Sequence, residues 1–273
     1  MTMPSTKTGI DALVRAMGKA GQRLRDLDAC EGGAGNISVA VRGPVDVAAR
    51  FPNAEPIELP APVPALAGAT VITTGSGSRL RDLLDDPEAT LGCIVIAADG
   101  KTGTLWSADE RAYTRPTSEL SSHLSVHAKW LAASETGMHA LVHAHPKNLT
   151  FLSHIDDYSV PGRLNARLMR WEPETVIFLP EGIGMASFEV PGTLDLMAAT
   201  EEMFKTYQVV LWAKHGAVAR YWSLPGALDR IEYAEAAARY EYMRLVSGAR
   251  IEGLSDDEIR AICAFHGVTQ SIL

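Results

Sequence analysis

The sequence predicts a single three-layer α/β domain, and two observations carry that prediction. Segments with the period of a strand alternate with segments of helical period along the chain. The chain has no internal repeat, and no linker is long enough to divide the 273 residues into two folding units. We therefore expect one domain over residues 1–273, with helices on both faces of a central sheet.

The N-terminal half begins with an amphipathic helix at 9–27, where Ile10, Leu13 and Met17 recur at the spacing of one helix face. The glycine-rich segment 31–36 ends this helix. We interpret residues 52–64 as an irregular surface excursion, because they hold five prolines and few residues that favour strands. The expected strands are 37–41, 70–73, 91–97 and 103–106, the last two joined as a hairpin.

The C-terminal half continues the alternation. A helix is expected at 119–133, with the hydroxyls of Thr117 and Ser118 available to cap it, and Pro146 is expected to open a short helix. Further strands are expected at 140–144, 176–179 and 209–212, and further helices at 192–207 and 225–246. In the last helix, one apolar stripe is expected to face the core: Leu228, Ile231, Ala238, Tyr242 and Leu245.

Composition and charge exclude several functions. The net charge of −8 argues against binding to nucleic acid or to an anionic membrane. Three widely spaced cysteines, Cys30, Cys93 and Cys263, argue against a disulfide framework or a cysteine-zinc site. No apolar run approaches the length of a membrane span, and residues 1–5 lack a signal-peptide core, so we expect a cytoplasmic protein.

The pair His143 and His145 is the most informative motif. On a strand, residues i and i+2 point to the same face, so two imidazoles would converge on one point, as a divalent metal requires. His215, at the end of the strand expected at 209–212, is a third candidate ligand. Three histidines without cysteine leave a coordination position open, which is typical of a catalytic metal site.

Other side chains compete for this role. His139 has the same parity on the strand as His143. Glu119, His123 and His127 are spaced i, i+4 and i+8 on the expected helix, where they would share one face. A lone histidine is more often a surface or hydrogen-bonded core residue than a ligand. Periodicity alone does not choose between these sets.

Two glycine-rich turns indicate an anion site. The turns at 32–35 and 75–77 can present backbone N–H groups to a phosphate, and Thr117 and Ser118 add hydroxyls at a helix N-terminus. Neither turn has the spacing of a P-loop or of a dinucleotide-binding motif, and each by itself is compatible with an ordinary turn. Glu119 is either a carboxylate stabilised by the helix dipole or, beside a metal, a candidate general base.

Five short motifs in a fixed order resemble the class II aldolase/adducin family. They are Gly35-Asn36-Ile37-Ser38, Thr74-Gly75-Ser76-Gly77, Pro116-Thr117-Ser118-Glu119, His143-Ala144-His145 and His215-Gly216. The resemblance covers nearly the whole chain. It implies a three-layer fold around a mixed, largely antiparallel sheet. It also implies a zinc-dependent aldolase that cleaves a phosphorylated ketose through an enediolate.

The resemblance further implies roles for individual residues. One Zn²⁺ per subunit would be held by His143, His145 and His215, with Glu119 as the acid/base group. The substrate phosphate would be surrounded by five residues: Asn36, Ser76, Gly77, Thr117 and Ser118. Glu174 would reach the active site of a neighbouring subunit in a homotetramer, and Glu172, two residues away, is the alternative for this position.

One position departs from the family pattern. The aldolases that this chain resembles carry an asparagine three residues before the one matching Asn36, and this chain has Gly33 there. A side-chain donor is lost, so we expect a weaker hold on phosphate or a different ligand, unless the Gly33 amide or a water compensates.

Other functions stay open at this stage. Family members that cleave fuculose phosphate, epimerise pentulose phosphates or dehydrate methylthioribulose phosphate share the same ligand pattern. A non-catalytic scaffold like the adducin head predicts missing histidines, whereas all three are present. A zinc hydrolase of the H-E-x-x-H type is not supported, since that motif is absent.

Overall fold

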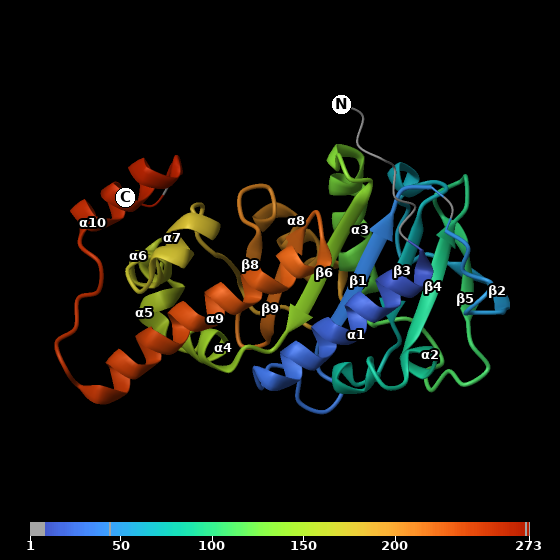
Figure 1. Ribbon diagram of the computed structural model, residues 1–273, viewed down its shortest axis with the longest axis horizontal. Coiled ribbons are helices and arrows are strands. Elements are labelled where there is room, and N and C mark those ends of the chain that lie inside the picture. The colour runs from blue at the N-terminus through green and yellow to red at the C-terminus, as the bar shows by residue number, and fades with distance from the viewer. Residues whose placement is uncertain (1–8, 44, 271, 273) are drawn as a thin grey trace.

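An open sheet of nine strands runs through the part of the chain that the computed structural model describes, residues 9–43, 45–270 and 272. The strands lie in the order β2-β5-β4-β3-β1-β6-β9-β8-β7, and each adjacent pair is antiparallel except β7 with β8 (Figure 1). The mixed, largely antiparallel sheet implied by the family resemblance is therefore confirmed. Their bounds are β1 (Asn36–Val41), β2 (Asn53–Glu58), β3 (Thr70–Thr74), β4 (Leu91–Ile96), β5 (Thr102–Ser107), β6 (Met138–Ala144), β7 (Gly184–Ala186), β8 (Val209–Trp212) and β9 (Gly216–Tyr221).

Helices cover both faces of the sheet, as a three-layer fold requires. Helices α1 (Ile10–Asp26) and α9 (Leu224–Ser247) cross the near face in Figure 1, and α3 (Leu120–Trp130) and α8 (Leu194–Met203) lie behind it. Strand β6 shows the alternation that this arrangement demands. Val142 packs in the core that includes α1 and α9, whereas its neighbour Leu141 packs with residues of α3 and α8.

The remaining helices are short or lie at the ends of the sheet. They are α2 (Pro87–Thr90), α4 (Lys147–Leu152), α5 (Asp156–Ser159), α6 (Arg163–Leu168), α7 (Pro173–Phe178) and α10 (Asp256–His266), with 3₁₀ turns at Pro64–Leu66, Leu80–Asp82 and Leu131–Ala133. Helix α4 follows Pro146 as predicted, and the hairpin β4–β5 is also confirmed.

The proline-rich segment 52–64 contains a strand that the sequence analysis missed. Residues Asn53–Glu58 form β2, which pairs with β5 at one edge of the sheet. An edge position tolerates Pro56, because an edge strand hydrogen-bonds on one side only. The side chains of β2 are exposed or half-buried, so they lack the apolar signal from which strands are recognised.

The prediction of a strand at 176–179 is wrong, because helix α7 (Pro173–Phe178) occupies most of this segment. Pro173 lies in the first helical turn, where its missing N–H removes no hydrogen bond. A four-residue apolar run cannot by itself distinguish a strand from a buried helix. Strands β7 and β9 and helix α10 were not anticipated.

The predicted apolar stripe of α9 is correct only in its first part. Leu228, Ile231 and Ala238 are buried, but Tyr242 and Leu245 are exposed. The reason is visible in Figure 1, where the last turns of α9 extend past the edge of the sheet.

Composition bears on the cysteines and on membrane spans. Cys30, Cys93 and Cys263 carry free thiols, as expected. Within residues 9–43, 45–270 and 272, no helix combines the length and the apolar character needed to cross a bilayer. The expectation for residues 1–5 concerns a segment outside the described range.

Candidate metal centre

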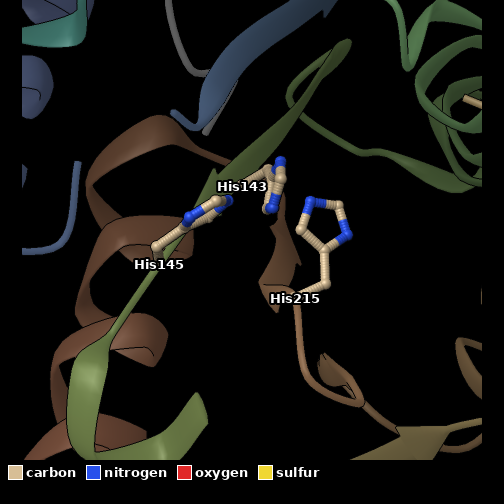
Figure 2. A group of neighbouring side chains, drawn as sticks. All are labelled: His143, His145 and His215. Carbon is tan, nitrogen blue, oxygen red and sulfur yellow. The ribbon is translucent and has the colours of Figure 1, made fainter. Parts of the chain in front are cut away.

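Three histidines meet where β6 ends beside the turn between β8 and β9. Figure 2 shows His143 and His145, from the end of β6, beside the ring of His215. Each offers a ring nitrogen, and these three nitrogens lie within 4.8 Å of one another. Among the described residues this is the one such group of potential metal ligands, and it does not include His139. The structure thus brings together the three histidines that the sequence motifs selected.

The turn that carries His215 is shaped by unusual backbone geometry. Lys214 has a positive φ of 64°, a conformation that is strained for a residue with a side chain. Its backbone N–H donates to Ser153 Oγ at 2.7 Å, which helps to hold the turn. At the next position after His215, a Cβ on Gly216 would lie 3.0 Å from His143 Nε2. The same Cβ would lie only 2.6 Å from the Ala144 carbonyl oxygen, so the His-Gly motif has a steric cause: glycine leaves room for the backbone after β6 and for the neighbouring imidazoles.

Two ring nitrogens of the cluster have no hydrogen-bond partner among the described residues. The ring of Trp212 packs against His143 and His215, with centroid distances of 4.5 and 5.3 Å. Nε2 of His143 and Nδ1 of His215 are buried and have no hydrogen-bond partner. Buried polar atoms are normally paired. The unpaired Nε2 of His143, beside the rings of His145 and His215, fits a divalent metal, for which neutral imidazole is a common ligand.

A carboxylate that the sequence analysis did not select orients His145. Glu31 Oε1 lies 3.0 Å from His145 Nδ1, so the opposite nitrogen of this ring is left for a ligand. Burial and the charge of His143 lower the pKa of His145, which favours the neutral form that a metal binds. A carboxylate behind a ligating histidine is a recurrent feature of metal sites. Glu31 lies in the loop after α1, where no periodicity marks it.

Glu119 lies against the histidine cluster and is almost fully buried, with 3% of its surface exposed. Its Oε2 accepts a hydrogen bond from Asn36 Nδ2 at 2.6 Å and lies 2.7 Å from His143 Nδ1, and its Oε1 is 3.7 Å from His215 Nε2. Burial opposes ionisation. The charge of His143 and hydrogen bonds from His143 and Asn36 outweigh burial and hold the pKa of Glu119 well below its usual range.

The predicted phosphate residues surround the same hollow, whose volume is about 200 Å³. Its lining comprises Gly33, Ala34, Gly35, Asn36, Gly75, Ser76, Gly77, Thr117, Ser118, Glu119, His143, His145, Pro191 and His215. The amides of Ser76 and Thr117 already donate to the carbonyls of Arg115 and Thr74. These two residues can therefore offer a ligand their hydroxyls but not their amides.

Gly33 and Gly77 lie close together in the lining of this hollow. A Cβ at Gly33 would lie 3.2 Å from the carbonyl oxygen of Gly77, closer than ordinary contact. The two glycine turns thus approach each other at the position where this chain departs from the family pattern.

Glu174 is not part of the hollow. It lies in the first turn of α7 and lines a separate, larger groove of about 830 Å³ together with Glu172, Glu232 and Arg239. Within one subunit the structure therefore does not bring Glu174 to the histidine cluster.

Comparison with known proteins gives the family. Residues 15–242 match the family described as Class II Aldolase and Adducin N-terminal domain. A rhamnulose-1-phosphate aldolase of Escherichia coli O157:H7 is 30% identical over 242 residues, 86% of each chain. Another, from Citrobacter koseri, is 29% identical over 214 residues, 78% of this chain and 77% of that one.

A solved structure agrees with this match. The sugar-phosphate aldolase from Thermotoga maritima is 28% identical, with a TM-score of 0.74, over 89% of this chain and 98% of that one. The chain therefore belongs to the class II aldolase and adducin family, and it is an enzyme, a lyase of the class II aldolase type. The family and fold class expected from the motifs are confirmed.

Proposed function

We propose that the chain is a zinc-dependent aldolase that reversibly cleaves L-rhamnulose 1-phosphate to dihydroxyacetone phosphate and L-lactaldehyde. The observation that carries this proposal is the hollow itself. It is lined at once by three convergent histidines, a buried carboxylate and two glycine-rich turns with hydroxyls. The names of the relatives that are about 30% identical over most of the chain support the substrate.

In this proposal, His143, His145 and His215 hold one Zn²⁺ per subunit, because three neutral imidazoles match the preferred ligands of that ion. When bound, the ion supplies Lewis-acid stabilisation of the negative charge that develops on the substrate oxygens as an enediolate forms. Glu31 keeps the ring of His145 in the orientation that leaves its second nitrogen for the metal.

Glu119 moves the proton at C3 of the substrate. In the cleavage direction the bond between C3 and C4 breaks, and Glu119, after taking a proton from solvent, delivers it to C3 to give dihydroxyacetone phosphate. In the reverse direction the same carboxylate removes that proton. The amide of Asn36 fixes the carboxylate by the hydrogen bond at 2.6 Å. The phosphate lies among Asn36, Ser76, Gly77, Thr117 and Ser118, which holds C3 beside Glu119.

The hollow is small for a whole ketose phosphate, because pockets for drug-sized ligands usually measure about 300–1,000 Å³. We infer that the working unit is a cytoplasmic homotetramer of one-domain subunits, in which a neighbour completes the site. Glu174 of the partner subunit, or Glu172 of the partner subunit, would take the proton of the C4 hydroxyl. The exposed position of Glu174 on α7 is compatible with this role.

A substrate panel tests the reaction. Purified, zinc-loaded protein is incubated with L-rhamnulose 1-phosphate, L-fuculose 1-phosphate and L-ribulose 5-phosphate. We expect L-rhamnulose 1-phosphate to have the highest kcat/KM and to release dihydroxyacetone phosphate. Faster cleavage of the fuculose ester, or epimerisation of the ribulose ester, would contradict the proposed substrate. Either result would assign the chain another reaction of the family. Full metal content without turnover of any substrate would favour a scaffold.

Mixed oligomers test the shared site. Inactive His143→Ala and Glu174→Ala subunits are co-expressed with different tags, and oligomers holding both are isolated. Some sites then combine an intact metal cluster with an intact Glu174, so we expect activity to return. If the tagged mixed oligomers are inactive, or if a monomer is fully active, the shared site is contradicted. Each subunit would then contain a complete active site.

A further inference from the structure

Behind Glu119, four buried polar side chains form a hydrogen-bonded chain that the proposed mechanism does not use. Ser38 comes from β1, His123 and His127 from α3, and His139 from β6, and each is at most 1% exposed. Ser38 Oγ lies 2.6 Å from His123 Nδ1 and 2.8 Å from His127 Nε2. Nδ1 of His127 lies 2.8 Å from Nδ1 of His139. We call these four residues the inner chain.

The inner chain ties the helix that carries Glu119 to the sheet. Glu119 is the residue before α3; its own side chain does not cap the helix, and its amide donates to Thr117 Oγ1 at 3.3 Å. The amide of His123, one turn later, donates to the carbonyl of Glu119 at 3.1 Å. Asn36 and Ser38 point from β1 to the same side, so one strand holds Glu119 by the first residue and the next turn of α3 by the second.

Counting protons shows that the inner chain has two possible orders. Burial lowers the pKa of His123 to about 4 and that of His139 to about 3, and it places the pKa of His127 well below its usual value, so all three rings are neutral at neutral pH. Three neutral imidazoles and one hydroxyl supply four protons for three contacts. The fourth proton must lie on Nε2 of His123 or on Nε2 of His139, and both atoms are buried without a partner.

The charges at the two ends favour one order. Arg220, which packs 3.5 Å from the ring centroid of Trp130, acts on the His139 end, where its positive charge disfavours a proton. The negative charge of Glu119 acts on the His123 end and favours a proton there. Both charges displace the four protons in the same direction, towards Glu119.

We propose that Ser38, His123, His127 and His139 are positioning residues for Glu119, and that they form a hydrogen-bond chain with one proton order. His139 Nδ1–H donates to His127 Nδ1, His127 Nε2–H donates to Ser38 Oγ, and the Ser38 hydroxyl donates to His123 Nδ1. His123 then carries its proton on Nε2, at the end of the chain where the charge of Glu119 acts. The positioning role rests on the proposed function of Glu119 in proton transfer, whereas the proton order does not.

Neutron diffraction from deuterated crystals tests the proton order directly. We expect deuterium on Nδ1 of His139 and on Nε2 of both His127 and His123, with Nε2 of His139 bare. The opposite set of sites, or a doubly protonated ring within the inner chain, would overturn the proposed order.

The positioning role is tested by removing the Ser38 hydroxyl, which links His123 to His127 in the inner chain. Ser38→Ala is compared with Ser134→Ala, which removes a buried hydroxyl that donates to the Met138 carbonyl at 2.6 Å, in the loop between α3 and β6. The assay follows exchange of the C3 proton of dihydroxyacetone phosphate with solvent, together with zinc content and the KM for this ligand. We expect Ser38→Ala to lower the exchange rate about 10–100-fold at unchanged zinc content and KM, the usual loss when an orienting partner is removed. Ser134→Ala should keep the wild-type rate, and equal rates in the two variants would overturn the role.

A second pair of variants covers the case in which Ser38→Ala does not fold. His139→Asn keeps an N–H donor at about the place of Nδ1, whereas His139→Leu removes it. We expect the asparagine variant to retain most of the exchange rate and the leucine variant to lose it. If the two variants exchange equally fast, the chain does not position Glu119. Absence of exchange in the wild type would instead refute the proposed function, and the neutron result would stand independently.

Discussion

Two groups of three histidines differ in what surrounds them, although both draw on strand β6. His139 and His143 point from this strand to the same side, four residues apart. His143 lies at the end of the strand, where it meets His145 and His215 at the wall of an open hollow. His139 lies near the opposite end of the strand, where it meets His127 of the inner chain. Strand parity thus decides which way a histidine points, and the end of the strand at which it lies decides whether it meets a ligand or another side chain.

The largest expected effect separates the two groups by metal content. His215→Ala should abolish both zinc binding and aldol cleavage, because two imidazoles are too few for a stable site of this type. His139→Asn should keep full zinc content, since its ring makes no contact with the cluster. Metal analysis of both purified variants, beside a cleavage assay, is the measurement. Full occupancy and activity in His215→Ala would return the ligand role to His139 or His123.

The next effect isolates proton transfer from metal binding. Glu119→Gln keeps the shape of the side chain and its contact with Asn36 but removes the base. Exchange of the C3 proton of dihydroxyacetone phosphate should fall about 10²–10⁴-fold, the usual range of general acid–base catalysis, with zinc retained. Exchange at the wild-type rate would assign Glu119 to structure alone.

A smaller effect is expected from the carboxylate behind His145. Glu31→Gln should weaken zinc affinity or activity about 10–100-fold, because Glu31 orients a ligand without being one. Glu55→Gln is a matched control, since Glu55 is a half-buried carboxylate at the far edge of the sheet that pairs with Arg111. Competition with a zinc chelator measures the affinity, and identical values for the two variants would exclude the orienting role.

The smallest effect concerns stability in acid. The folded pKa of His139 is about 3 and that of an ordinary histidine is 6.5, so the unfolded chain binds the extra proton between these values. Stability should therefore fall as pH drops from 6.5 towards 3, by at most about 1.4 kcal/mol per unit for each such ring. His139→Asn should show a shallower loss than the wild type in denaturant titrations of metal-free protein at pH 6.5 and 5. Equal slopes would mean that His139 is not buried in its neutral form.

The sequence was sufficient for the parts of the site that depend on local geometry. Strand parity placed His143 and His145 on one face, and the order of five motifs added His215 and Glu119. It was not sufficient where distant segments meet. The contact of Ser38 with two rings of α3 depends on how the helix lies over β1, and no spacing along the chain encodes that. Glu31 was missed for the same reason, since its partner His145 is 114 positions away.

The errors in the fold have local causes. The run 176–179 is as apolar as a strand, and only the preceding Glu172-Pro173 marks the helix that it actually forms. β2 was concealed by Pro56, by the prolines that follow it and by its exposed side chains. In both cases the tertiary environment decided between conformations that the local sequence allows.

Strand β2 also has a consequence for how the protein behaves in a crowded solution. An open sheet ends in strands with unpaired N–H and C=O groups, onto which another chain can add as a further strand. At this edge, Pro56 removes one N–H from the row, and Glu55 and Glu58 place negative charges on either side of it. The same residues that hide the strand from recognition in the sequence therefore discourage edge-to-edge aggregation, and a Pro56→Val change would make this edge a template for misassembly.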